Sequence, residues 1–174
     1  MVTSNSDLDR SPIFQNMPPE QRSKFLKLVD YAEFPEGETI LKEGRSTQNL
    51  WIILKGCCEV VKILSNGEEQ QFDVLEPGAV FGEMSFFHPA PHSASIRAVT
   101  RVEVMRLSRG NYARLEETAP AAAHTIAFNT ATVLAERLRK MDDWIRNLVR
   151  QPEAAQHRKE WREFRAKLYT DWEF

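Results

Sequence analysis

Short runs of β-prone, apolar residues alternate with glycine-containing turns in the middle of the chain. Six of the seven glycines lie between Gly37 and Gly82, which marks a region of tight turns. The runs predict six strands, at residues 39–41, 50–54, 59–64, 70–75, 95–99 and 102–107. Asn66-Gly67 is typical of a tight hairpin turn that joins the third and fourth runs. Many short strands with close turns favour a small β-barrel or jelly roll, because parallel strands would need helical crossovers.

Helical spacing flanks this β-rich region on both sides. A helix is predicted to begin at Pro19, because proline suits a first turn, and residues 110–150 carry a long helical region. Within it, apolar residues step alternately by four and three, the heptad pattern of a coiled coil. This seam consists of Ala127, Ala131, Leu134, Leu138, Met141, Ile145 and Leu148. It predicts a homodimer interface over residues 131–148; the alternative is a stripe that covers the barrel of its own chain.

The composition is that of an ordinary globular protein. Of 174 residues, 42% are hydrophobic and 28% charged, which excludes a disordered or fibrous chain and suits one domain with an appendage. The 23 Lys and Arg residues against 25 Asp and Glu give a net charge of −2, and thus no reason to expect binding to nucleic acid or anionic membranes. The longest apolar run is Leu50 to Leu54, and the N-terminus lacks a signal-peptide pattern. A cytoplasmic location without membrane association is therefore expected.

Reactive and metal-binding side chains form no recognisable catalytic pattern. The only cysteines, Cys57 and Cys58, would point to opposite faces of a strand, so a disulfide between them is not expected. A redox or haem-binding role for this pair is an alternative, although buried strand cysteines are usually inert. Glu83, His88 and His92 suggest a zinc site, but both histidines flank prolines in a loop. We therefore expect neither a metal site nor an enzyme.

Three glycine-containing segments carry a family resemblance: residues 34–44 (FPEGETILKEG), 50–56 (LWIILKG) and 77–84 (PGAVFGEM). They resemble the cyclic nucleotide-binding domain of the CRP/FNR-type regulators and of the regulatory subunits of cAMP-dependent protein kinase. The resemblance covers about residues 11–149. It implies an α+β fold in which a jelly-roll barrel is flanked by N-terminal helices and a long C-terminal dimerisation helix. The expected organisation is a flexible N-terminus (1–10), the barrel with its N-terminal helix (11–110), the long helical region (111–150) and an amphipathic tail (151–174).

In this family a phosphate-binding cassette follows the third segment. The resemblance assigns ligand binding to Phe81, Gly82, Glu83, Met84, Ser85, His92 and Ser93. The backbone after Gly82 would face the phosphate, and Glu83 would accept a hydrogen bond from a ribose hydroxyl. An ungapped match places His92 where the family has an arginine that pairs with the phosphate. Loss of that cation costs about 3–5 kcal/mol, so weakened binding of cAMP and cGMP is predicted.

Two interpretations of His92 stay open. In the first, a protonated imidazole replaces the arginine and contacts an anionic ligand. In the second, the pocket is empty or filled by the chain itself, with Phe86 and Phe87 where the nucleobase would lie. On the long helix, Met141 and Asp142 stand where CRP-type members carry two hydroxyl residues that contact adenine, which points in the same direction.

The segment from Gln151 onward has 24 residues, fewer than the roughly 50 that a winged-helix DNA-binding domain needs, so direct DNA binding is not expected. Trp161, Phe164 and Leu168 predict one amphipathic helix there, which would cap the fold or dock on a protein partner. The resemblance thus implies a stand-alone sensor or regulatory module. It would be a homodimer that binds a cyclic nucleotide or another small anion. The alternative is a ligand-free scaffold that uses the same fold for protein–protein contacts.

Overall fold

The computed structural model describes residues 8–64 and 66–150, which belong to two compact units that meet in sequence between Ala131 and Thr132. The strands of the first unit are β1 (Asp30–Phe34), β2 (Thr39–Leu41), β3 (Asn49–Lys55), β4 (Cys58–Ile63), β5 (Glu69–Leu75), β6 (Val80–Phe81), β7 (Ser95–Ala98) and β8 (Val102–Ser108). Its helices are the 3-10 turn η1 (Pro12–Phe14), α2 (Pro19–Leu26), α3 (Glu83–Phe87) and α4 (Arg109–Thr118). Helix α5 (Pro120–Arg150) begins in the first unit and continues into the second.

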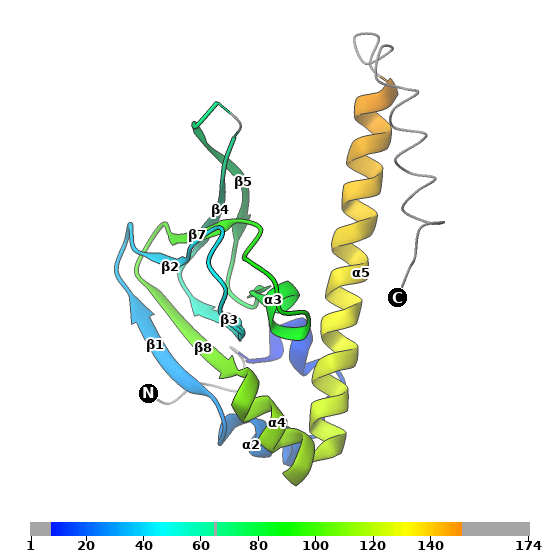
Figure 1. The fold of residues 1–174 in the computed structure, drawn as a ribbon. Helices are drawn as coiled ribbons and strands as arrows, with labels where there is room; N and C mark the ends of the chain where they lie inside the picture. Colours follow the sequence, from blue (N-terminus) through cyan, green and yellow to red (C-terminus); the bar gives the residue numbers. More distant parts are fainter. Residues whose placement is uncertain (1–7, 65, 151–174) are drawn as a thin grey trace. The chain divides into compact units, whose positions relative to one another are not determined.

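The strands form two antiparallel four-stranded sheets, with strand orders β1-β8-β3-β6 and β2-β7-β4-β5 (Figure 1). This arrangement confirms the predicted α+β jelly roll, and α2 begins at Pro19 as predicted. The β4–β5 hairpin is confirmed as well, with Ile63 opposite Glu69. Its loop is longer than the predicted two-residue turn: the Leu64 amide donates to the Glu68 carbonyl at 2.8 Å, and of the two expected turn residues only Gly67 has a positive φ.

Strands β1 and β6 were not predicted. β1 reads Asp-Tyr-Ala-Glu-Phe, and its polar residues break the apolar alternation that marks a strand. What holds it is pairing with β8, in which Asp30 lies opposite Arg106 and their side chains form an ion pair at 2.8 Å. β6 has only two residues, too few to show the alternation of apolar and polar residues that marks a strand.

β3 is buried on both faces and separates two apolar clusters. Leu50, Ile52 and Leu54 face a cluster shared with the helices, which includes Phe25 of α2 and Leu115 of α4. Its other face meets the interior of the barrel, where the residues are Leu41, Trp51, Ile53, Cys58, Leu75, Phe81, Ile96, Ala98, Val102 and Val104. A strand that faces two cores reads as a continuous apolar run, which explains the sequence from Leu50 to Leu54.

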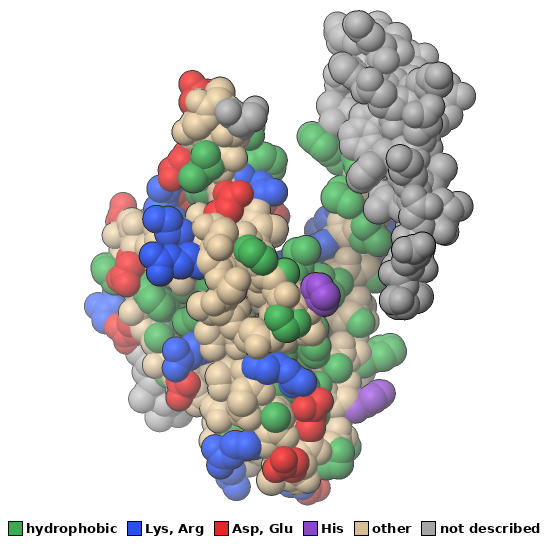
Figure 2. Space-filling view, viewed as in Figure 1, with side chains coloured by type: hydrophobic (Ala, Val, Ile, Leu, Met, Phe, Trp, Pro, Cys, Tyr) green, Lys and Arg blue, Asp and Glu red, His purple; other side chains and the backbone are tan. Residues whose placement is uncertain are grey.

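The helices of the first unit are tied to one another by buried polar contacts. The Asn129 side-chain amide in α5 donates to the carbonyls of Ile13 and Gln15, at 2.8 and 2.9 Å. Leu8, within the stretch predicted to be flexible, is buried in the cluster shared with the helices. Over the face of the barrel seen in Figure 2, positive and negative side chains lie among one another.

The second unit contains the rest of α5, and most of the described seam side chains in it are accessible. Leu138 and Met141 are 58% and 48% exposed, and Leu134 and Ile145 are partly exposed. The side chain of Leu148 and the amphipathic tail predicted at 151–174 lie outside the described residues. The homodimer therefore stays a prediction. In the described part of the chain, no helix has the length and apolar character needed to cross a membrane.

Candidate functional site

The cassette begins where β6 passes into α3 through Gly82. Gly82 adopts a left-handed conformation with φ +78° and occupies the N-cap position of α3. A Cβ at this position would lie 2.5 Å from the carbonyl oxygen of Asn49 and 3.1 Å from Cδ1 of Trp51. Glycine is therefore required by the backbone angle and by the close approach of β3, in addition to any approach of a ligand.

The other predicted cassette residues lie in the short helix α3 and in the loop that follows it. Glu83 and Ser85 are buried, with 4% and 3% exposure, whereas Met84 is 59% exposed. The Ser93 hydroxyl lies 3.9 Å from the sulfur of Met84, so these two residues are neighbours near the surface. The structure thus directs Glu83 and Ser85 inward and leaves Met84 outward.

His92 is fixed by four hydrogen bonds. Its Nδ1 lies 2.9 Å from the Ser85 hydroxyl, and its Nε2 lies 2.8 Å from the hydroxyl of Thr47 in the loop between β2 and β3. Its backbone amide donates to the Arg45 carbonyl at 2.8 Å, and its carbonyl accepts from the Gly44 amide at 3.0 Å. Two of the predicted residues, Ser85 and His92, are therefore in direct contact.

Thr47 was not singled out from the sequence. It lies 45 residues before His92 and belongs to no motif. Its hydroxyl comes into contact with the imidazole because Gly44 and Arg45 pair with the backbone of His92. Gly44, with φ +77°, and Arg45 together oppose the single residue His92, as in a glycine-type β-bulge. Only this long-range pairing identifies Thr47 as part of the site.

The environment of His92 favours the neutral imidazole. Burial lowers the pKa of His92 below its ordinary 6.5, because desolvation penalises the charged form. A neutral imidazole offers one donor and one acceptor nitrogen, and a hydroxyl serves as partner for either. The chain Ser85–His92–Thr47 is therefore satisfied without a charge.

Aromatic side chains flank the cassette on two sides. On the barrel side, Phe81 stacks on Trp51 with 5.9 Å between ring centroids. The indole N–H of Trp51 is buried and has no hydrogen-bond partner among the described residues. On the other side, Phe86 is fully buried in the cluster shared with the helices, 5.3 Å from Tyr112. Phe86 therefore does not fill the barrel interior, which removes it from the self-filled-pocket interpretation.

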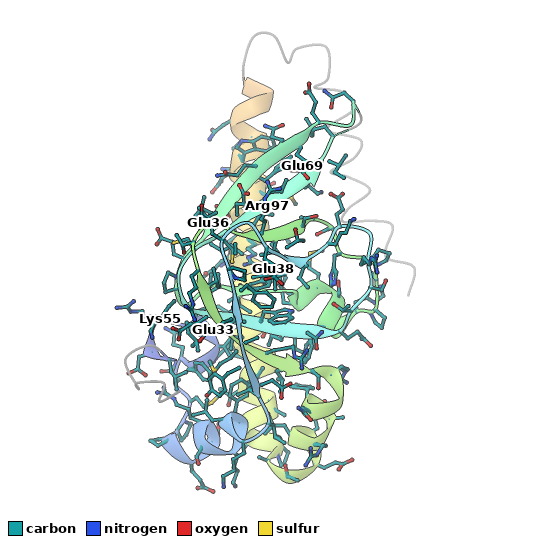
Figure 3. All side chains as sticks on the ribbon, turned by 90° about the vertical axis from the view of Figure 1, so that its left-hand side faces the viewer. Glu33, Glu36, Glu38, Lys55, Glu69 and Arg97 are labelled. Atoms are coloured by element: carbon teal, nitrogen blue, oxygen red, sulfur yellow. The ribbon has the colours of Figure 1, made fainter. Side chains whose placement is uncertain are left out.

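Arg97, the nearest arginine after the cassette in sequence, is held elsewhere. Its guanidinium donates to Glu59 at 2.7 Å and to Glu69 at 3.0 Å. These hydrogen bonds raise the pKa of Arg97. Figure 3 shows Arg97 and Glu69 close together on the β4–β5 side of the barrel. Among the described residues, no three His, Cys, Asp or Glu side chains lie together as a metal ion would require.

The two antiparallel sheets, with the Gly82 turn into the short helix α3, define a jelly-roll domain. The family model for the cyclic nucleotide-binding domain matches residues 31–119, about half of the chain. The chain belongs to the cyclic nucleotide-binding domain family.

The relatives include bacterial regulators and eukaryotic kinase subunits. The chain is 33% identical over 132 residues to the cyclic AMP receptor protein of Thermus thermophilus, a match that covers 76% of this chain and 59% of the relative. It is 31% identical over 108 residues to the cAMP-dependent protein kinase regulatory subunit of Blastocladiella emersonii, covering 62% and 27%. The crystal structure of the T. thermophilus catabolite activator protein has a TM-score of 0.71 at 32% identity, covering 79% of this chain and 63% of that one. The chain thus spans about three-fifths of the T. thermophilus proteins and about a quarter of the kinase subunit.

Proposed function

We propose that the chain is a regulatory module that binds a small molecule at the cassette, residues 81–93, and passes the event to α5. The observation that carries this proposal is the cassette itself: the left-handed Gly82, the inward Glu83 and the fixed His92 stand in a chain that belongs to a ligand-binding family. Relatives named as a cyclic AMP receptor and as cAMP-dependent kinase subunits support a cyclic nucleotide or a related molecule as the ligand class.

A continuous set of contacts supports the route from the cassette to α5. Phe86 of α3 packs edge-on against Tyr112 of α4. The Tyr112 hydroxyl donates to the Ala123 carbonyl in the first turns of α5, at 3.0 Å, and this contact is buried. A movement of α3 on ligand binding would therefore reach α5 through one aromatic ring. The junction at Ala119 and Pro120 between α4 and α5 is the proposed hinge.

The output is proposed to be a homodimer that forms through the seam of α5. The exposed side chains of Leu138 and Met141 lie three residues apart on the seam and would be covered in a two-stranded coiled coil. Light scattering on the full chain is expected to give the mass of a dimer, and a monomer at high concentration would contradict the seam. A protein partner that docks on residues 151–174 is a further proposal for the output.

Ligand binding is tested by thermal unfolding of the full chain with cAMP, cGMP, adenosine and inorganic phosphate. A ligand at 100 times its Kd stabilises the folded state by about 2.7 kcal/mol, which shifts Tm by several degrees. No shift with any of these compounds would favour the alternative, a ligand-free scaffold. The exposed seam supports the scaffold alternative, because a scaffold needs only a surface for protein–protein contacts.

A further inference from the structure

We propose that the subsite next to His92 offers no positive charge and selects an uncharged, hydroxyl-bearing nucleoside over the corresponding cyclic nucleotide. This inference rests on the proposed function, since it concerns which molecule the cassette takes. Cyclic nucleotides differ from nucleosides by one negative charge, and the described side chains of the cassette provide no fixed positive charge to meet it.

The geometry of His92 carries the first step. Both ring nitrogens already have hydroxyl partners, at 2.9 Å and 2.8 Å, and both backbone groups are hydrogen-bonded to residues 44 and 45. The ring cannot turn toward a phosphate without breaking contacts to Ser85 and Thr47. A protonated ring would place a charge at 5% exposure between two neutral hydroxyls, with no counter-charge from either.

Thr47 gives the subsite its chemical preference. Ser85 and His92 are buried, whereas Thr47 is exposed, so its hydroxyl is the end of the chain that a ligand can reach. If the Thr47 hydroxyl accepts from the imidazole, its own hydrogen is free to donate; if it donates, a lone pair is free to accept. Such an end group suits a ligand hydroxyl, which likewise both donates and accepts.

The charges around the cassette carry the second step. Residues 81–93 contain no lysine or arginine, and the one acidic side chain among them is Glu83, which is buried. Arg97 is engaged by two carboxylates. Arg106 pairs with Asp30 and lies over the ring of Trp51.

Arg45 is the rival source of positive charge. Its backbone is hydrogen-bonded to His92, but its side chain is exposed to solvent. A solvated guanidinium meets an anion only weakly, since charges in water interact by about 1 kcal/mol at contact distance. The experiment therefore includes a variant that removes this charge.

The test is calorimetric titration of the full chain with adenosine, guanosine, cAMP and cGMP, using the native protein, His92→Arg, His92→Gln and Arg45→Gln. The native protein is expected to bind a nucleoside more tightly than its cyclic nucleotide. His92→Arg is expected to raise affinity for the cyclic nucleotide about 100-fold relative to the nucleoside, because it restores a buried cation. His92→Gln adds no charge and should not show the gain in affinity for the cyclic nucleotide that His92→Arg shows. Arg45→Gln removes a solvent-exposed charge and should leave the native preference unchanged.

The outcomes separate this inference from the proposed function. A native protein that binds cAMP or cGMP at least as tightly as the nucleoside overturns the inference and leaves the proposed function standing. If Arg45→Gln then removes that binding, Arg45 supplies the charge. A native protein that binds the nucleoside, and that binds the cyclic nucleotide tightly only after His92→Arg, supports the inference. No binding by the native protein or by any folded variant, with folding checked by circular dichroism, removes both. If His92→Arg does not fold, the native preference and His92→Gln decide.

Discussion

Replacement of Gly82 by alanine separates two costs that the structure places at one residue. The first is the left-handed backbone at φ +78°, which costs a residue with a Cβ about 1–2 kcal/mol. The second is the approach of that Cβ to within 2.5 Å of the Asn49 carbonyl oxygen, where β3 or α3 must shift. Overpacking of this kind costs about 1–3 kcal/mol. Gly82→Ala is therefore expected to lower the free energy of unfolding by about 2–5 kcal/mol.

Two other glycines serve as matched controls. Gly44 has nearly the same backbone angle, φ +77°, with no atom within 4 Å of a built Cβ, so Gly44→Ala carries only the conformational cost. Gly110 has neither feature and lies in α4, where alanine is expected to stabilise by about 0.5–1 kcal/mol. Urea unfolding of the three variants gives the costs, provided that the m-value is unchanged. Equal losses for Gly82→Ala and Gly44→Ala, to within about 0.5 kcal/mol, would refute the role given to the Asn49 contact.

Three further predictions concern charge, assembly and thiol reactivity. Burial lowers the pKa of His92 in the folded state, so the unfolded chain binds the extra proton first as the pH falls. The free energy of unfolding should therefore be at its full value above pH 6.5 and decrease below it. Unfolding of the native protein and of His92→Gln at several pH values should show this loss as a difference between the two. Met141→Glu places a charge on the seam and should dissociate the dimer, as measured by light scattering. Asn147→Glu lies off the seam and should leave the dimer intact. The same mass for both variants would contradict the seam. Burial raises the pKa of Cys58 to about 12, so a thiol reagent at pH 8 should modify Cys57 first and Cys58 only on unfolding; equal rates would contradict its burial.

Most of the strands that the sequence predicts have apolar residues that face a core; in β5 only Leu75 does so, since Phe72 and Val74 are 54% and 45% exposed. β3 could be found because Leu50 to Leu54 fill two clusters at once. β1 could not be found, because its acidic residues Asp30 and Glu33 pair with arginines about 70 residues away in the chain. These arginines are Arg106 and Arg101. Local pattern carries no information on pairs so distant in the chain.

The candidate site divides in the same way. The Gly82 turn is predictable because its glycine and its neighbours are consecutive in sequence. The partner of His92 is not, because Thr47 reaches the ring only after β2 and β7 pair and bring the loop 42–47 against residue 92. The sequence also does not predict which core Phe86 faces, since a side chain in a five-residue helix can point toward either one.

The strand order has a consequence for how the chain folds. β8 lies between β1 and β3, and β7 lies between β2 and β4, so the central partner of each sheet comes from residues 95–108, after the other six strands. Neither sheet is continuous until this late segment is inserted, and Asp30 then meets Arg106 across 76 positions. Closure over such separations is slow and leaves apolar strands uncovered in the meantime. During synthesis on the ribosome, β1 and β2 therefore emerge before residues 95–108, the segment that supplies their partners, and in this interval the chain is more exposed to aggregation.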